Sequence, residues 1–137
     1  MRLSAVALSV FALLAFSGNV HAGRTAPLVD PAPVSVPAGT TQDSLVKDIK
    51  RALLGRGWTI TAERPGEIDS TLFIRDHEAK IRVTYDLQSV RFTYVDSKNL
   101  NYRLDRKGKA EIHGNYLGWI KNLTNDLGVN LQLSQSP

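Results

Sequence analysis

The 137-residue chain contains no cysteine. This absence excludes disulfide bonds, thiolate metal sites, cysteine nucleophiles and lipid attachment at a cysteine. The sequence also lacks a Gly-rich phosphate-binding loop, a G-x-S-x-G nucleophile elbow and internal repeats. A domain with this composition must be held together by its hydrophobic core alone, and the usual nucleotide-binding and serine-hydrolase motifs are missing.

A strong charge of one sign is also missing. The chain has 17 Lys and Arg against 13 Asp and Glu, a net charge of +4. Basic and acidic residues are interleaved, whereas nucleic-acid-binding proteins concentrate basic side chains in one stripe. With 42% hydrophobic and 22% charged residues, the composition is typical of a globular protein. We therefore predict a folded domain without a nucleic-acid partner.

Residues 1–22 have the layout of a secretory signal peptide. Arg2 is followed by an apolar run from Val6 to Phe16, and small residues precede a predicted cleavage site after Ala22. The run is shorter than the roughly 20 residues that a membrane-spanning helix needs. We therefore expect cleavage after Ala22, a periplasmic location and no membrane span.

The remaining sequence divides into a short linker and one domain. Residues 23–39 contain four prolines and no periodic pattern, which predicts an extended Pro-rich linker. A single α+β domain is expected over residues 40–137. Its first helix should begin near Thr40 and end at Gly55, because apolar residues recur there at helical spacing.

Alternating apolar and polar residues follow the first helix and predict four consecutive strands between Trp58 and Val95. A second helix should begin near Ala110 and end at Gly128, with residues 129–137 as a tail. The predicted fold is a four-stranded antiparallel meander with an N-terminal and a C-terminal helix packed on one face. In this α-β-β-β-β-α two-layer sandwich, Trp58 and Trp119 lie between the layers.

The sequence from His77 to Leu127 resembles small exported proteobacterial proteins of unassigned function, many of them lipoproteins. The resemblance covers most of the expected mature domain and implies export and a fold, but no activity. Asn19 stands where lipoproteins carry the lipidated cysteine, so membrane anchoring is not implied. The most specific segments are Asp96-Ser97 with Asn99-Leu100-x-Tyr102, and Ile112-His113 with Asn115-Tyr116-x-x-Trp119.

One candidate binding site lies where the loop after the fourth strand meets the start of the second helix. Amide, phenol and imidazole groups gather there in a pattern suited to binding sugars, peptides or peptidoglycan fragments. The alternative is a structural network that caps the helix and fixes the loop. The candidate residues are Asn99, Asn101, Tyr102, His113, Asn115 and Tyr116.

A second candidate is the polar face of the sheet. Arg75, Arg82 and Arg91 are expected to point the same way, with Phe73 among them. Cationic groups around an exposed phenylalanine could bind an anionic partner or a protein. The alternative is an ordinary solvated sheet face.

Catalytic and metal sites find little support in the sequence. His77 and His113 belong to no metal-spacing motif, and we predict no metal and no cofactor. Asp96, Ser97 and His113 could form a hydrolytic triad only if the fold joined serine to histidine.

The leading interpretation is a non-enzymatic binding or accessory module of the cell envelope, whose partner is an envelope protein or a peptidoglycan or sugar fragment. The alternatives are a small periplasmic hydrolase using His113 and a structural accessory protein.

Overall fold

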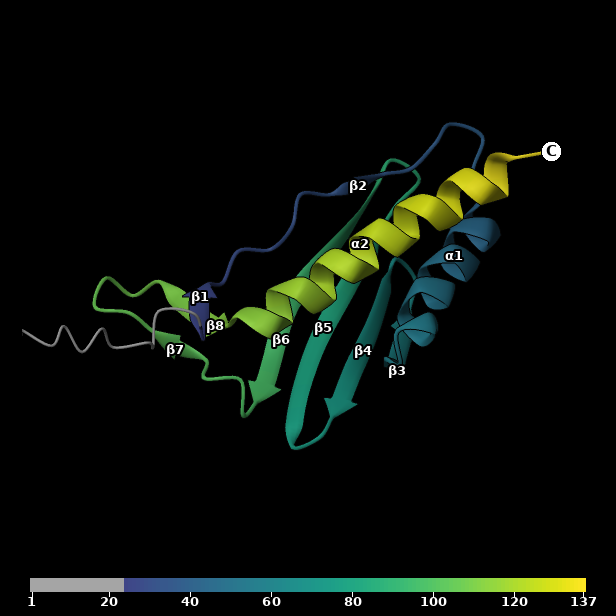
Figure 1. Cartoon of the computed structure of the whole chain (residues 1–137). Coiled ribbons are helices and arrows are strands. Elements are labelled where there is room, and N and C mark those ends of the chain that lie inside the picture. Colours follow the sequence, from purple (N-terminus) through teal and green to yellow (C-terminus); the bar gives the residue numbers. More distant parts are fainter. Residues whose placement is uncertain (1–23) are drawn as a thin grey trace, which may run out of the picture.

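A computed structural model describes residues 24–137, which form two helices and two antiparallel sheets. Both helices lie on one face of the larger sheet (Figure 1). That sheet has the strand order β2-β6-β5-β4-β3. Its strands are β2 (Val34–Ser35), β3 (Thr59–Arg64), β4 (Glu67–Ile74), β5 (His77–Tyr85) and β6 (Ser89–Lys98). The predicted α+β class and antiparallel pairing are confirmed, and β2 adds a fifth strand at one edge.

The smaller sheet was not predicted. It has the strand order β1-β8-β7, with β1 (Thr25–Pro27), β7 (Arg103–Leu104) and β8 (Ala110–His113). It lies beyond the first turn of α2 (Gly114–Gln135), at one end of the molecule (Figure 1). The second helix therefore begins four residues later than expected, because residues 110–113 are extended and pair with both β1 and β7.

The Pro-rich segment is part of the folded domain instead of a linker that stands apart from it. Strand β1 pairs with β8, and β2 pairs with β6. The amide of Leu28 donates to the carbonyl of Ala110 at 2.9 Å, and that of Val36 donates to Gln88 at 3.0 Å. Proline is tolerated at sheet edges because its missing N–H can face away from the partner strand. Pro27 can therefore stand in the edge strand β1, while the other three prolines lie outside both strands.

Helix α1 (Gln42–Gly55) forms where the apolar periodicity predicted it. The Thr41 hydroxyl accepts a hydrogen bond from the Ser44 amide at 3.2 Å and caps the first turn. After the helix, Gly57 has a φ of 80°, a left-handed conformation that glycine adopts without steric cost. The core face of the helix buries Leu45, Ile49, Ala52 and Leu53.

Helix α2 continues seven residues beyond the predicted end at Gly128 and reaches Gln135. Asn130 and Leu131 are buried, so packing against the rest of the protein outweighs the poor helix propensity of glycine. The side-chain amide of Asn130 donates a hydrogen bond to the backbone carbonyl of Asp48 in α1 at 3.1 Å. The Ser134 hydroxyl donates to the Asp48 carboxylate at 2.7 Å. These contacts join the last turns of α2 to the middle of α1.

A β-bulge in β3 changes which side chains face the helices. The pairing with β4 shifts between Ile60 and Ala62. Such a bulge adds one residue and reverses the alternation that follows it. Glu63 consequently lies opposite Ile68 of β4, on the helix side of the sheet, and forms a salt bridge with Lys50 of α1.

The hydrophobic core lies between the helices and the larger sheet and includes Trp58 and Phe92, each 2% exposed. Trp119 is only partly buried at the edge of this core. Among residues 24–137, neither helix is long and apolar enough to cross a membrane. The predicted signal peptide lies outside the described residues.

Candidate functional site

Three tyrosines meet at the end of the larger sheet beside the smaller one. The ring of Tyr94 stacks on Tyr102, with centroids 5.1 Å apart and planes 8° apart. The ring of Tyr116 packs edge-to-face against Tyr94, with the two ring centroids 5.6 Å apart and the planes nearly perpendicular. Burial raises the pKa of Tyr116, and burial also raises the pKa of Tyr94, although Ser97 opposes that shift. Both phenols are therefore neutral hydrogen-bonding groups at physiological pH.

The loop after β6 positions Tyr102 through an unusual backbone. Asn99 has a φ of 56° and Asn101 a φ of 54°, both in the left-handed region that asparagine tolerates better than most residues. Between them, Leu100 is 2% exposed and anchors the loop in the core. The Asn99 side chain donates to the carbonyl of Asp76 at 2.7 Å. Two strained residues around a buried anchor thus hold Tyr102 at the surface.

Two adjoining hollows flank Tyr102. The first has a volume of about 360 Å³ and is lined by residues 94–97 and 99–102. The second has a volume of about 320 Å³ and is lined by Arg24, Thr25, Asn101, Tyr102 and Arg103. Because Asn101 and Tyr102 line both, we treat the pair as one site and call it the Tyr102 cleft. Tyr102 is 46% exposed.

Several polar groups of the Tyr102 cleft are already held in place. The Ser97 hydroxyl and the Tyr94 hydroxyl are 2.7 Å apart and hydrogen-bonded. The Asp96 carboxylate accepts from the Ser97 amide at 2.8 Å. In residues 24–137, by contrast, the side chains of Asn101 and Tyr102 make no hydrogen bond, and both residues are exposed. The cleft therefore combines an aromatic face, fixed hydroxyls and an available amide.

His113 and Asn115 have local structural contacts. The Nδ1 atom of His113 accepts a hydrogen bond from the Asn115 amide at 3.1 Å, so His113 is the N-cap of α2. Its own amide donates to the carbonyl of Leu100 at 2.7 Å. The side chain of Asn115 is exposed. These two residues order the start of the helix and do not line the Tyr102 cleft.

The residues of the hypothetical triad are engaged elsewhere. Ser97 is hydrogen-bonded to Tyr94, while the Nδ1 of His113 is occupied by the Asn115 amide. Acyl transfer by serine needs a direct contact between the serine hydroxyl and a histidine nitrogen. No hydrogen bond joins Ser97 to His113 within the described part of the chain. The same part contains no group of three or more His, Asp or Glu side chains that could hold a metal ion.

The three arginines of the polar sheet face do not form a common patch. Arg75 lies in the turn between β4 and β5, with a φ of 56°, whereas Arg91 lies opposite Thr84 near the other end of β5. Arg82 is paired with Asp69, with its Nε atom 2.8 Å from a carboxylate oxygen. The predicted cationic surface is therefore divided between two ends of the sheet and partly neutralised.

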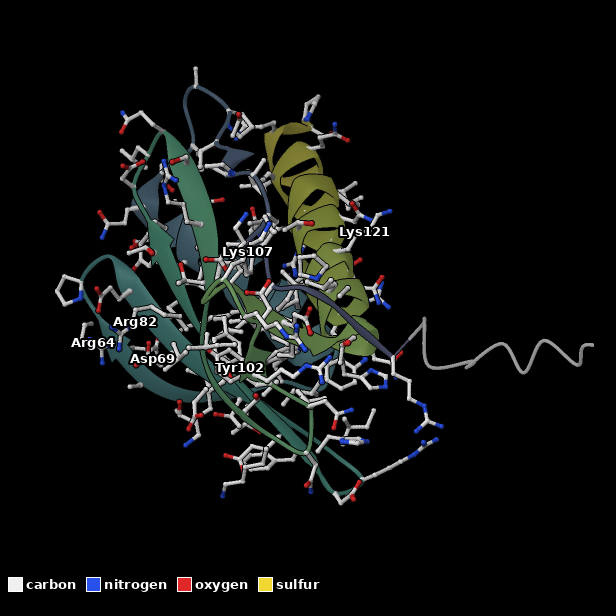
Figure 2. All side chains as sticks on the ribbon, turned by 90° about the vertical axis from the view of Figure 1, so that its left-hand side faces the viewer. Arg64, Asp69, Arg82, Tyr102, Lys107 and Lys121 are labelled. Atoms are coloured by element: carbon white, nitrogen blue, oxygen red, sulfur yellow. The ribbon has the colours of Figure 1, made fainter. Side chains whose placement is uncertain are left out.

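Asp69 is the centre of an ion-pair network on this face. It also accepts a hydrogen bond from Arg64 at 2.9 Å, so two guanidinium groups surround one carboxylate (Figure 2). Hydrogen bonds from Arg82 and Arg64 lower the pKa of Asp69 from 3.8 to about 2. Glu67 completes the network through Arg64 at 2.9 Å. This arrangement joins β3, β4 and β5 and has a stabilising role.

Replacing Asp69 with asparagine is expected to lower the free energy of unfolding by about 1 kcal/mol at pH 7, since solvent screens the half-exposed arginines. The folded-state pKa is depressed, so the stabilisation is present above about pH 4 and is lost as pH falls toward 2. Urea denaturation across this range should show the wild type and Asp69→Asn converging in acid. A difference that stays constant with pH would contradict the ionic explanation. Asp76→Asn, at a carboxylate 77% exposed, serves as the control.

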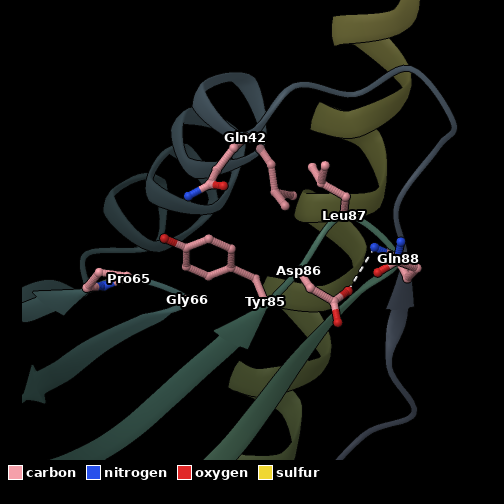
Figure 3. Close-up of a pocket in the computed structure, with 8 residues that line it drawn as sticks. Gln42, Pro65, Gly66, Tyr85, Asp86, Leu87 and Gln88 are labelled. Atoms are coloured by element: carbon pink, nitrogen blue, oxygen red, sulfur yellow. Dashed lines mark hydrogen bonds between the residues drawn. The ribbon is translucent and has the colours of Figure 1, made fainter.

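A further hollow lies at the opposite end of the sheet, with a volume of about 450 Å³ (Figure 3). It is lined by the β3–β4 turn, the β5–β6 loop and the first turn of α1. The Asp86 carboxylate is occupied by the amides of Gln88 and Ser89, each at 2.8 Å. The Gln42 side chain reaches toward the Tyr85 ring, but few other polar groups converge there. This hollow is larger than either hollow of the Tyr102 cleft taken alone, but it is chemically poorer.

No known protein family, curated protein or solved structure matches the chain. The resemblance to small exported proteins therefore stays a prediction. The site has to be judged by its own chemistry.

The structure brings together some predicted site residues and adds others. Tyr102 and Tyr116 pack against Tyr94, and Asn99 lines the same hollow as Tyr94 and Tyr102. Arg24 was missed as a site residue. Nothing in the sequence indicated that Arg24 would lie near Tyr102.

Proposed function

We propose that the protein is a non-enzymatic binding module of the cell envelope that recognises a saccharide carrying an acidic group, such as a peptidoglycan fragment. The observation that carries the proposal is the Tyr102 cleft. An exposed aromatic ring lies there beside hydrogen-bonding groups from one short loop. Sugar rings present apolar C–H faces and peripheral hydroxyls, so they need both features in one site.

The cleft offers a specific binding mode. One sugar ring would pack on Tyr102, whose position is fixed by stacking on Tyr94. Its hydroxyls would meet Asn101 and the Ser97–Tyr94 pair on one side of the ring. Arg24 and Arg103 line the other side and would attract a carboxylate of the ligand. Arg103 already forms a salt bridge with Glu111, with 2.9 Å between its Nε atom and a carboxylate oxygen. Arg24 is therefore the more available cation.

Binding without catalysis fits these contacts better than hydrolysis does. Glycoside hydrolysis commonly uses two carboxyl groups on either side of the scissile bond. The Tyr102 cleft contains one carboxylate, Asp96, and it is hydrogen-bonded to a backbone amide. The His113 hydrolase remains the alternative, and a search for release of sugars or acyl groups would test it.

Tyr102→Ala is expected to weaken binding of a muramidase-released disaccharide-peptide about 5- to 30-fold, because an aromatic contact of this kind contributes roughly 1–2 kcal/mol. Isothermal titration calorimetry measures the effect. Arg24→Gln should weaken binding of this acidic fragment but not of a neutral N-acetylglucosamine oligomer. Phe73→Ala is the matched control, since Phe73 is 62% exposed and lies outside the cleft.

The melting midpoint of each variant should be measured together with its affinity. Tyr102 is nearly half exposed, so its removal should change the midpoint only slightly. Equal losses of affinity in Tyr102→Ala and Phe73→Ala would reject the Tyr102 cleft as the site. The absence of binding to either saccharide by the wild type would reject the proposed ligand class.

A further inference from the structure

The turn between β7 and β8 has a composition that the proposed saccharide site does not use. It contains Arg106, Lys107 and Lys109, all exposed and without a salt bridge to any residue in the described range 24–137. Leu104, just before the turn, is 61% exposed. In Figure 1 the turn lies at the tip of the smaller sheet, away from both helices. We call residues 104–109, which are this turn together with Leu104 at the end of β7, the basic turn.

The basic turn is held in a defined shape. One carboxylate oxygen of Asp105 accepts from the amides of Lys107 at 2.8 Å and Lys109 at 2.9 Å. The Asp105 amide donates to the Lys109 carbonyl at 2.7 Å, and Gly108 adopts a φ of 76°. The one acidic side chain of the turn is thereby engaged by its own backbone. The three cations extend from a fixed base and face solvent.

The net positive charge of residues 24–137 is concentrated at this end. These residues contain 16 of the 17 Lys and Arg side chains of the sequence, Arg2 being the other one, and all 13 Asp and Glu side chains. The smaller sheet, its turn and Arg24 hold five of these cations and two of the acids, a net charge of +3. The remainder of the described chain has eleven of each sign and is electrically balanced. The protein is therefore polarised, with one cationic tip.

From this polarity and the exposed leucine, we infer that the basic turn docks the protein on a bilayer surface rich in anionic phospholipid. Clustered Lys and Arg side chains are attracted to such surfaces, each by a few-fold in affinity. An apolar side chain among them can enter the interface between headgroups and acyl chains. Leu104 fits that role, whereas a soluble polyanion offers no apolar region that its side chain could enter. The saccharide site lies beside the turn, so docking would hold the Tyr102 cleft near the membrane surface.

The inference is tested by co-sedimentation with vesicles of phosphatidylcholine alone and vesicles of equimolar phosphatidylglycerol and phosphatidylcholine. The wild-type protein is used in the form recovered from cells after any processing. It should bind only the anionic vesicles, and high salt should release it. The triple variant Arg106→Gln, Lys107→Gln, Lys109→Gln should lower the partition coefficient by about 100-fold, roughly five-fold for each charge. Leu104→Ser should lower it several-fold without changing the net charge.

The control is a second triple variant, Lys47→Gln, Arg91→Gln, Lys121→Gln, which removes the same charge from exposed sites on other elements. It should keep most of the vesicle binding. Equal losses in the two triple variants would overturn the assignment to the basic turn. Equal binding to neutral vesicles would overturn the electrostatic basis. If Leu104→Ser has no effect and soluble polyphosphate binds equally well, the surface is a general polyanion site and not a membrane-docking one.

This test is independent of the saccharide proposal. None of the substituted residues lines the Tyr102 cleft, so the triple variant of the basic turn should bind the neutral oligosaccharide with unchanged affinity. Tyr102→Ala should conversely retain most of its vesicle binding. Either property can therefore fail without the other.

Discussion

Replacement of Trp58 by alanine is expected to lower the free energy of unfolding by about 3–5 kcal/mol, the usual cost of removing a large aromatic side chain from a core. Trp58 is 2% exposed and lies between α1 and the start of β3. Its amide also donates to the carbonyl of Leu53 at 3.0 Å, which fixes the turn between the two elements. Urea denaturation followed by circular dichroism measures the loss without depending on tryptophan fluorescence.

Trp119→Ala is the matched comparison. The sequence pattern placed both tryptophans between the layers, but Trp119 is only partly buried. Its replacement should therefore cost about 1–2 kcal/mol, since less apolar surface is exposed to water on truncation. Similar losses in the two variants would contradict the core described for this structure.

Deletion of residues 129–137 is expected to destabilise the protein by about 4 kcal/mol. Leu131 is 2% exposed, and loss of a buried leucine costs about 2–5 kcal/mol. The deletion also removes Ser134 and Asn130, the hydrogen-bond donors to Asp48, whose side chain is only 2% exposed. An unsatisfied buried polar group adds about 1–3 kcal/mol.

Two point variants separate the parts of this effect. Leu131→Ala should reproduce much of the loss, whereas Val129→Ala should change stability by less than about 0.5 kcal/mol because Val129 is 54% exposed. Thermal and urea unfolding both measure these differences. A fully stable deletion variant would mean that the residues after Gly128 form the tail that the glycine suggested.

Periodicity predicted the elements that bury a regular stripe of side chains. Helix α1 and strands β4 to β6 follow the apolar pattern, because each has one face toward the core, and β3 follows it only up to its β-bulge. The short strands β1, β2, β7 and β8 have two to four residues, too few for a period to be visible. The end of α2 was missed for another reason, since tertiary contacts of Leu131 and Asn130 outweigh the local preference of Gly128.

The candidate site was predicted in part for the same physical reasons. Asn99 and Tyr102 are close in sequence to β6, so a local loop is enough to bring them to the hollow that Tyr94 also lines. Arg24 reaches the cleft through pairing between distant strands, which no local pattern contains. The arginines of the sheet face were misjudged because Asp69, the partner of Arg82, belongs to a neighbouring strand.

The pairing of β1 with β8 has a consequence for how the chain folds. Thr25 lies opposite His113, 88 positions later in the sequence, and α1 packs on α2 across a similar separation. Contacts between distant residues require closure of large loops before they add stability, which slows folding. During synthesis, the N-terminal strand has no partner until nearly the whole chain has been made. The smaller sheet and the packing of α1 on α2 can therefore be completed only late in synthesis, whereas the hairpins of β3 to β6 need no such distant partner.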